Sequence, residues 1–336
     1  MSVQPISPAA AALRAQIIGS AQAELVAGVG KVAQTGHSTP QAARTPHPDP
    51  VQQAVSAART EAAGRQAGLA PLFADLGQAL TSPALPPQAR AAISGLLSLQ
   101  LPTTAPLTGE VVQQAVARSG LFLEARLAQT PGPPAPDLKS ALLVLRQVLA
   151  EAQPDAPLHS RPAKTPPPTR DGPLSGQPPA ATALPPEANL ATLAQRLGGD
   201  VEQTLARQVL HQLASLPQPG TSAWMFELPL ATSQGTAIAQ FEIDQEGHAG
   251  SAGETVQTWR VRFSLDIEPL GPVHVQLGAG GERATVIIWA EREESLERLR
   301  DRGDQLAGAL PADVIFHPGA PRRPPPPAGQ LMDQSL

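Results

Sequence analysis

The clearest hydrophobic pattern in the chain is a strict alternation of apolar and polar residues between positions 259 and 268. The apolar positions are Trp259, Val261, Phe263, Leu265 and Ile267. Successive side chains of a strand point to opposite faces of a sheet, so a period of two places all of these side chains on one face. The pattern predicts a half-buried antiparallel strand.

Shorter strand-like runs flank this segment, at 224–230, 237–244, 273–277, 284–290 and 314–316. The run Pro269-Leu270-Gly271-Pro272 ends the alternating strand, because proline cannot donate to a neighbouring strand and glycine accepts turn dihedrals. Leucines at helical spacing predict a helix over 291–308. The order β-β-β-β-β-α-β predicts an α+β core at 221–317, with a small, mostly antiparallel sheet and one covering helix.

A helical pattern precedes this core. Apolar residues recur at helical spacing through 67–152, which predicts a helical subdomain, and through 188–216, which predicts a helix leading into the core. The last predicted helix of the subdomain follows Asp137 as N-cap and has on one face Leu138, Leu142, Leu145 and Leu149. Leucines at this spacing favour a packed core over a cofactor pocket. The C-terminal domain is therefore expected to span 188–317.

Three further segments are dominated by turn-forming residues. Residues 1–66 contain short Ala/Gln runs broken by glycine and proline, which predict a disordered N-terminal segment. Residues 153–187 hold 11 prolines, which predict a semi-rigid spacer, or alternatively a proline-rich ligand of an adaptor domain. Residues 318–336 are expected to be a disordered, proline-rich tail. The α+β core is thus preceded by a largely disordered, partly α-helical, Ala/Pro-rich arm.

Composition supports a weakly packed arm. The chain of 336 residues has 39 prolines and 28 glycines, and Phe73 and Phe122 are the only aromatic residues before Trp224. Few large side chains are therefore available to offset the entropy of ordering this region. The absence of cysteine excludes disulfides and thiolate metal sites. The chain also lacks a secretory signal pattern and a long apolar window, so membrane insertion is not expected.

Charge divides unevenly along the chain. Residues 221–317 carry 7 arginines and 15 acidic residues, a net charge of −8, which leaves +3 of the total of −5 for the remainder. An acidic surface repels phosphate backbones, so nucleic acid is not an expected partner.

No pattern of catalytic or metal-binding residues is found. The histidines at 37, 47, 159, 211, 248, 274 and 317 lack the spacing of a helical zinc site. Gly250-Ser251-Ala252-Gly253 has alanine where a nucleophile elbow needs its first glycine, and Gly278-Ala279-Gly280-Gly281 lacks the lysine of a phosphate-binding loop. We therefore predict no catalytic, cofactor or metal site, and a protein that is not an enzyme.

The run from Val261 to Leu277, the glycine turn after it, the strand to Ala290 and the charged helix resemble the C-terminal domain of flagellar hook-length control proteins. The resemblance covers about residues 221–317. The family also has a long Pro/Ala/Gln-rich N-terminal part before a compact C-terminal domain. In this chain Pro269 directly precedes Leu270-Gly271, where the family pattern has two intervening residues.

The resemblance implies a protein that leaves the bacterial cytoplasm through the flagellar type III apparatus and reaches the exterior, with residues 1–66 as a possible export signal. Such a protein measures the growing hook, contacts hook and hook-cap proteins during export, and docks its C-terminal domain on the cytoplasmic domain of the export gate. Docking switches export from hook-type to filament-type substrates. The turn Glu268, Pro269, Leu270 and Gly271 is our candidate partner contact, and a monomer without cofactor is expected.

Other functions remain open at this point. A needle-length regulator of a virulence type III secretion system shares this kind of domain. A non-catalytic scaffold, in which arm length is irrelevant, and an enzyme using the loop 247–253 are further alternatives. For a measuring function, roughly 220 arm residues at about 3.1 Å each would reach some 700 Å when extended, and about half of that when helical.

Overall fold

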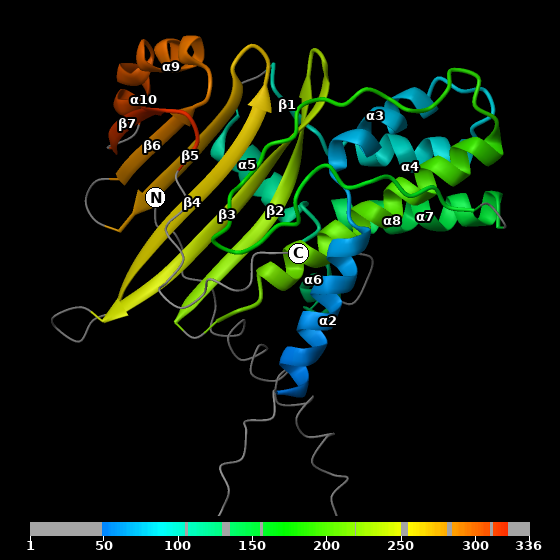
Figure 1. The fold of residues 1–336 in the computed structure, drawn as a ribbon, viewed down its shortest axis with the longest axis horizontal. Coiled ribbons are helices and arrows are strands. Elements are labelled where there is room, and N and C mark those ends of the chain that lie inside the picture. Colours follow the sequence, from blue (N-terminus) through cyan, green and yellow to red (C-terminus); the bar gives the residue numbers. More distant parts are fainter. Residues whose placement is uncertain are drawn as a thin grey trace, which may run out of the picture. The chain divides into compact units, whose positions relative to one another are not determined.

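A sheet of seven strands forms the centre of the fold, with its strands side by side in the order in which they occur in the chain (Figure 1). They are β1 (Leu101–Pro102), β2 (Thr221–Thr232), β3 (Gly235–Ala249), β4 (Thr255–Ile267), β5 (Gly271–Ala279), β6 (Ala284–Ala290) and β7 (Ala312–Pro318). Strands β2 to β6 are antiparallel, whereas β1 pairs with β2 and β7 pairs with β6 in parallel. The predicted α+β class, with a mostly antiparallel sheet, is confirmed.

The computed structural model describes residues 49–104, 107–129, 135–154, 157–218, 220–249, 255–280, 284–309 and 312–321. Its helices are α2 (Pro50–Arg65), α3 (Leu69–Ala79), α4 (Pro87–Leu97), α5 (Gly109–Ala117), α6 (Leu123–Gln129), α7 (Leu138–Ala152), α8 (Leu190–Ala214), α9 (Glu293–Arg300) and α10 (Gly303–Ala309). Contacts place Met1–Asp49 in one unit and Pro50–Leu336 in another. The predictions for residues 1–48 and 322–336 lie outside the described residues.

Helix α7 begins at a complete capping box. A carboxylate oxygen of Asp137 accepts from the backbone N–H of Ser140 at 2.7 Å, and the Ser140 hydroxyl accepts from the N–H of Asp137 at 2.9 Å. Two N–H groups without helical partners are thereby satisfied, which confirms the predicted N-cap. The four predicted leucines of α7 are all buried.

The first face of the sheet carries the apolar positions of the alternating pattern. Helix α9 packs on it at β5 to β7 through Leu296, and α5 packs on it at β2. Between them Phe226, Phe241 and Phe263 stack from strand to strand, with ring centroids 5.3 Å apart in each pair. The predicted covering helix is therefore present, broken into α9 and α10.

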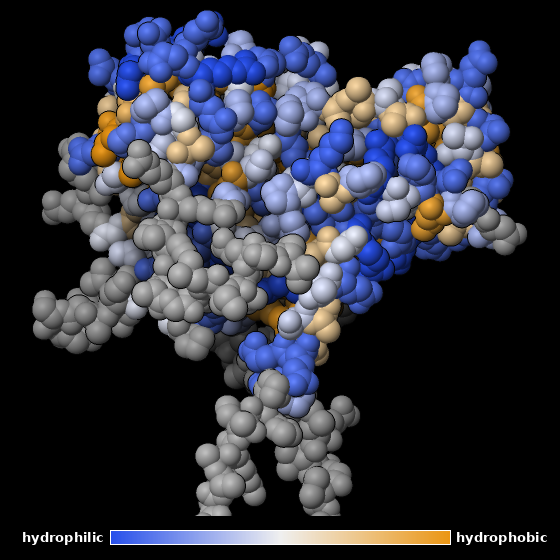
Figure 2. All heavy atoms as spheres, viewed as in Figure 1, coloured by the Kyte–Doolittle hydropathy of each residue, from blue (hydrophilic) through white to orange (hydrophobic). Residues whose placement is uncertain are grey.

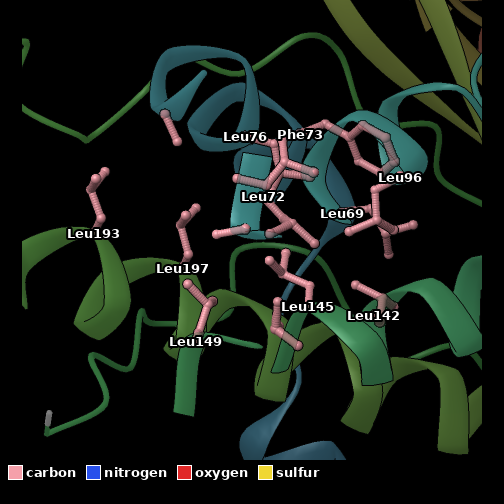
Figure 3. Close-up of a cluster of buried hydrophobic side chains, with 14 of the residues drawn as sticks. Leu69, Leu72, Phe73, Leu76, Leu96, Leu142, Leu145, Leu149, Leu193 and Leu197 are labelled. Atoms are coloured by element: carbon pink, nitrogen blue, oxygen red, sulfur yellow. The ribbon is translucent and has the colours of Figure 1, made fainter. Parts of the chain in front are cut away.

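The second face of the sheet joins the helical region. Helices α3, α4, α7 and α8 share one hydrophobic core, which Figure 3 shows as facing leucines around Leu145. Ile238 of β3 is fully buried in the same core. The region expected as a subdomain at 67–152 therefore packs against the sheet, because its apolar helix faces are completed by a strand residue.

Residues 157–187, which we call the strap, correct the expectation of a spacer. The strap runs across the helices and then across the second face of the sheet (Figure 1). Gln177 exchanges two backbone hydrogen bonds of 2.8 Å with Ile238, and the N–H of Gly176 donates to the hydroxyl of Ser264 at 3.0 Å. Proline keeps the strap extended, and several of its backbone N–H groups donate to side chains of the fold, which no local pattern predicts.

Gly198 and Gly199 allow the strap to approach α8 closely. Both lie within α8, which continues through them without a break. A Cβ at Gly199 would overlap the carbonyl oxygen of His159 in the strap. The glycines therefore reduce helix propensity locally but permit a backbone contact that a larger residue would block.

Helix α2 is a second correction, because its residues 50–65 form the end of the segment 1–66 that was expected to be disordered. Its last turn packs Ala62 against Ala206 and Leu210 of α8. The backbone N–H of Ala67 then donates to the carbonyl of Gln203 at 3.4 Å. The helix is weakly amphipathic, so tertiary contact at its C-terminal end decides its position.

Arg161 fastens the strap to two helices. Its guanidinium bonds Asp200 of α8 through two N–H groups, at 2.8 and 2.9 Å, and also pairs with Asp75 of α3. Burial raises the pKa of Asp200 to about 6, because the bonds from Arg161 offset only part of that effect. The strap is thus held by one cation between two carboxylates.

Asp200→Asn should change how stability depends on pH. In the folded protein the pKa of Asp200 lies above its ordinary value, so the folded state binds this proton more strongly and loses stability as pH rises from about 4 to about 6. The asparagine variant should lack this contribution, which amounts to at most about 3 kcal/mol. Urea unfolding midpoints at several pH values measure it, and parallel curves for the two proteins would contradict it.

Candidate docking site at the β4–β5 turn

The turn between β4 and β5 has a defined backbone. The Glu268–Pro269 peptide is cis, and the N–H of Leu270 donates to the carbonyl of Ile267 at 2.8 Å. Gly271 has φ 68°, in the left-handed region that favours glycine. A Cβ at this position would also overlap the side chain of Arg292. The left-handed backbone conformation and the close contact with Arg292 therefore explain why glycine follows Leu270 in this turn.

The start of α9 clamps this turn. Both terminal guanidinium nitrogens of Arg292 donate to the two carboxylate oxygens of Glu268, at 2.7 Å each. The hydroxyl of Ser295 donates to the carbonyl of Leu270 at 2.7 Å, and the Leu270 side chain packs into the core beneath α9. The bidentate pair fixes orientation as well as distance.

The four residues predicted as a partner contact have different positions. Glu268 and Pro269 are exposed, Leu270 is half-buried and Gly271 is buried. The hydrogen bonds from Arg292 lower the pKa of Glu268, so this carboxylate is charged at neutral pH. Of the four, only Glu268 and Pro269 are thus exposed at the surface, while Leu270 and Gly271 hold the turn in shape.

Acidic groups surround the turn. Burial raises the pKa of the half-buried Asp266, an effect that Arg292 opposes and the nearby Glu268 adds to. Glu291 and Glu293, at the start of α9, are exposed. The turn therefore projects from a negatively charged part of the surface.

A second group of carboxylates lies on the second face of the sheet. Carboxylate oxygens of Asp171, Glu242 and Asp244 come within 4.8 Å of one another. Arg262 pairs with Glu242, and Arg260 bonds both Asp244 and Asp171 at about 3 Å. Two guanidinium groups pair with these three carboxylates, so the cluster forms an ion-pair network between strap and sheet.

Three histidines of the described part of the chain have side-chain partners other than serine. His211 is buried with Nε2 3.4 Å from Glu227, and burial lowers its pKa. His274 bonds Glu291 at 3.0 Å, and His317 stacks on Trp289. Ser251 of the glycine-rich loop lies outside the described residues. In the described ranges, no helix combines the length and apolar character that spanning a membrane requires.

The fold and the clamped turn define an α+β module with an acidic turn that Arg292 holds in place. Residues 247–314 match the family model described as flagellar hook-length control protein FliK. This stretch runs from the end of β3 into β7 and includes both the turn and its clamp. The C-terminal region of the chain is therefore a flagellar hook-length control domain, as the resemblance predicted. Searches of curated proteins and of solved structures found no match.

Sequence reasoning missed the role of Arg292. One signal was present, because Arg292 is the only basic residue among positions 291–297. Its pairing with Glu268 nevertheless spans 24 positions and depends on how β6 returns beside β5.

Proposed function

We propose that this protein controls flagellar hook length without catalysis, and that its C-terminal domain switches the specificity of export. The exposed part of the turn, Glu268 and Pro269, docks on the cytoplasmic domain of the flagellar export gate. The observation that carries the proposal is the rigid, charged turn within the family-matched region.

Rigidity favours this site as a recognition element. A turn that is already held in one conformation loses little entropy when it binds a partner. The net charge of −8 over residues 221–317 would attract a basic surface and speed the encounter with it. Because this net charge is negative, we propose that the protein binds neither nucleic acid nor the membrane interior. We also propose that it is a monomer.

The route of the protein follows from the same proposal. It starts in the bacterial cytoplasm and is exported through the flagellar channel to the exterior, where it passes hook and hook-cap proteins. The helices and the strap pack with the sheet, so the extended length of the arm is reached only when the chain unfolds for passage. In this proposal, the unfolded chain measures the hook while it passes through the channel.

Glu268→Gln is expected to lengthen hooks and to reduce the number of filaments. The change removes the charge that faces the partner but keeps the shape of the side chain, and loss of one charge-assisted contact weakens docking about tenfold. Hook lengths are measured by electron microscopy in a strain that lacks the native gene and carries the variant. Protein in the culture medium shows whether export itself persists, which we expect.

Two control variants separate contact from geometry. Arg292→Gln leaves the Glu268 carboxylate in place but releases the turn, so a smaller increase in hook length is expected. Glu297→Gln removes an exposed carboxylate one turn further along α9 and should have no effect. Normal hooks and filaments with Glu268→Gln would refute docking through this turn. Altered needles of a secretion system, with normal hooks, would favour a needle-length regulator.

A further inference from the structure

The second face of the sheet is covered unevenly. Helices α8 and α3 pack on β2 and β3, and the strap crosses β3 and β4. Towards β7 the face carries large side chains with partial exposure, including Trp289 and Ile287. Ile315 of β7 is 43% exposed. Figure 2 views this face and shows hydrophobic side chains at its left, over β6 and β7.

A hollow of about 320 Å³ lies between the strap and this part of the sheet. Its walls include Pro173 and Leu174 of the strap, Trp289 of β6, and the residues that follow β7, Ala320 and Pro321. The size is that of a small ligand site, and most of these side chains are apolar.

His274 and Trp289, which line the hollow, belong to an aromatic row. His274, Trp289 and His317 occupy neighbouring register positions on β5, β6 and β7. The rings of Trp289 and His317 stack with centroids 5.9 Å apart and an angle of 27° between their planes. Grooves with such aromatic walls bind proline-rich segments, because the rings contact the flat faces of a polyproline helix.

We propose that this hollow binds the proline-rich segment of the same chain that follows it, Pro324 to Pro327. Pro321 already lines the hollow, and only Arg322 and Arg323 separate it from this run. So short a connection gives an effective concentration in the millimolar range, well above that of a separate ligand. Four consecutive prolines are also preordered, so binding them loses little entropy.

Charge complementarity favours this segment. Arg322 and Arg323 directly follow Pro321 in the sequence and carry two positive charges. The carboxylate of Asp171, which lines the hollow, is 62% exposed although it pairs with Arg260. Arg262, the other arginine of the lining, pairs with Glu242, and Glu291 bonds His274 at the edge of the hollow. A run of three prolines begins at Pro166, whose carbonyl accepts a hydrogen bond from Arg207. That run is therefore already engaged in the fold.

The indole N–H of Trp289 provides a direct measurement. The chain has only three tryptophans, so ¹H–¹⁵N spectra of the full chain contain three indole signals, and Trp289→Phe assigns the relevant one. A chain shortened to end at Pro321 retains all strands of the sheet. We expect the Trp289 signal to shift in it, whereas those of Trp224 and Trp259 stay in place.

A synthetic peptide of residues 322–336, added to the shortened chain, should return the Trp289 signal saturably towards its position in the full chain. The matched peptide has alanine at 324–327 and should bind about tenfold more weakly. An unchanged signal in the shortened chain, or equal binding of the two peptides, would overturn the proposal. A signal in the full chain that depends on protein concentration would mean that a second copy's segment is bound, which would overturn it as well.

Discussion

Replacing Glu227 with glutamine is expected to lower the free energy of unfolding by about 3–5 kcal/mol. Glu227 on β2 and Arg207 on α8 are both completely buried. The guanidinium of Arg207 donates to the carboxylate through Nε at 2.9 Å and through Nη2 at 2.7 Å. The variant would leave the guanidinium of Arg207 buried without a negative partner. Removing one partner of a buried ion pair is strongly destabilising, because the remaining charge is neither hydrated nor paired.

The pair also joins segments that are distant in the sequence. Arg207 donates to the side chain of Gln66 at 2.7 Å and to the carbonyl of Pro166 in the strap at 3.0 Å. Gln177 of the strap donates to Glu227 at 2.9 Å. Loss of the carboxylate charge should therefore weaken the attachment of α2, α8 and the strap to the sheet together.

Urea unfolding followed by tryptophan fluorescence measures the effect. The matched control is Glu61→Gln, which breaks a pair with Arg65 on the surface of α2, where the side chains are 68% and 66% exposed. Exposed pairs contribute about 0–1 kcal/mol, so the control should unfold close to the wild type. Equal losses of unfolding free energy in the two variants would show that the buried pair contributes no more to stability than the exposed pair.

The same variant should alter acid sensitivity. Burial raises the pKa of Glu227, but Arg207 and His211 outweigh this and lower it to about 2. The folded pKa therefore lies below the ordinary value, so its contribution is present above about pH 4.5 and is lost as the pH falls towards 2. Glu227→Gln should lack this loss, which stability measurements between pH 5 and pH 3 can detect.

Leu145→Ala is the second change with a large expected effect, about 2–5 kcal/mol of destabilisation. Leu145 of α7 is fully buried in the core shared by the helices and Ile238. Truncation leaves a cavity in that core, so both layers should lose stability together. Unfolding seen by tryptophan fluorescence and by far-ultraviolet circular dichroism should shift by the same amount.

Tryptophan fluorescence reports on the sheet alone, because Trp224, Trp259 and Trp289 lie on β2, β4 and β6. The control is Val144→Ala, the preceding residue of the same helix, which is 52% exposed. It should change stability by less than about 0.5 kcal/mol. A fluorescence transition that Leu145→Ala leaves unchanged would show that residues 67–152 unfold as a separate subdomain, as the sequence suggested.

Local sequence patterns predicted those parts of the fold that depend on neighbouring residues. The alternation through Phe263 predicted β4, and the Asp137 cap predicted the start of α7, because periodicity and capping act within a few positions. The turn at Gly271 was predicted for the same reason. The pattern did not show which of the turn residues face outward, since Arg292 fixes that from another element.

The sequence alone determined the class of the C-terminal domain, its acidic charge and its family resemblance, since these depend on composition and on short-range order. Tertiary structure decided that the strap crosses the sheet, that Ile238 completes the helical core, and that Arg207 meets Glu227. The local sequence pattern around each of these residues is compatible with several tertiary arrangements. Burial selects one of them, because only there do the apolar faces close and the buried charges find partners.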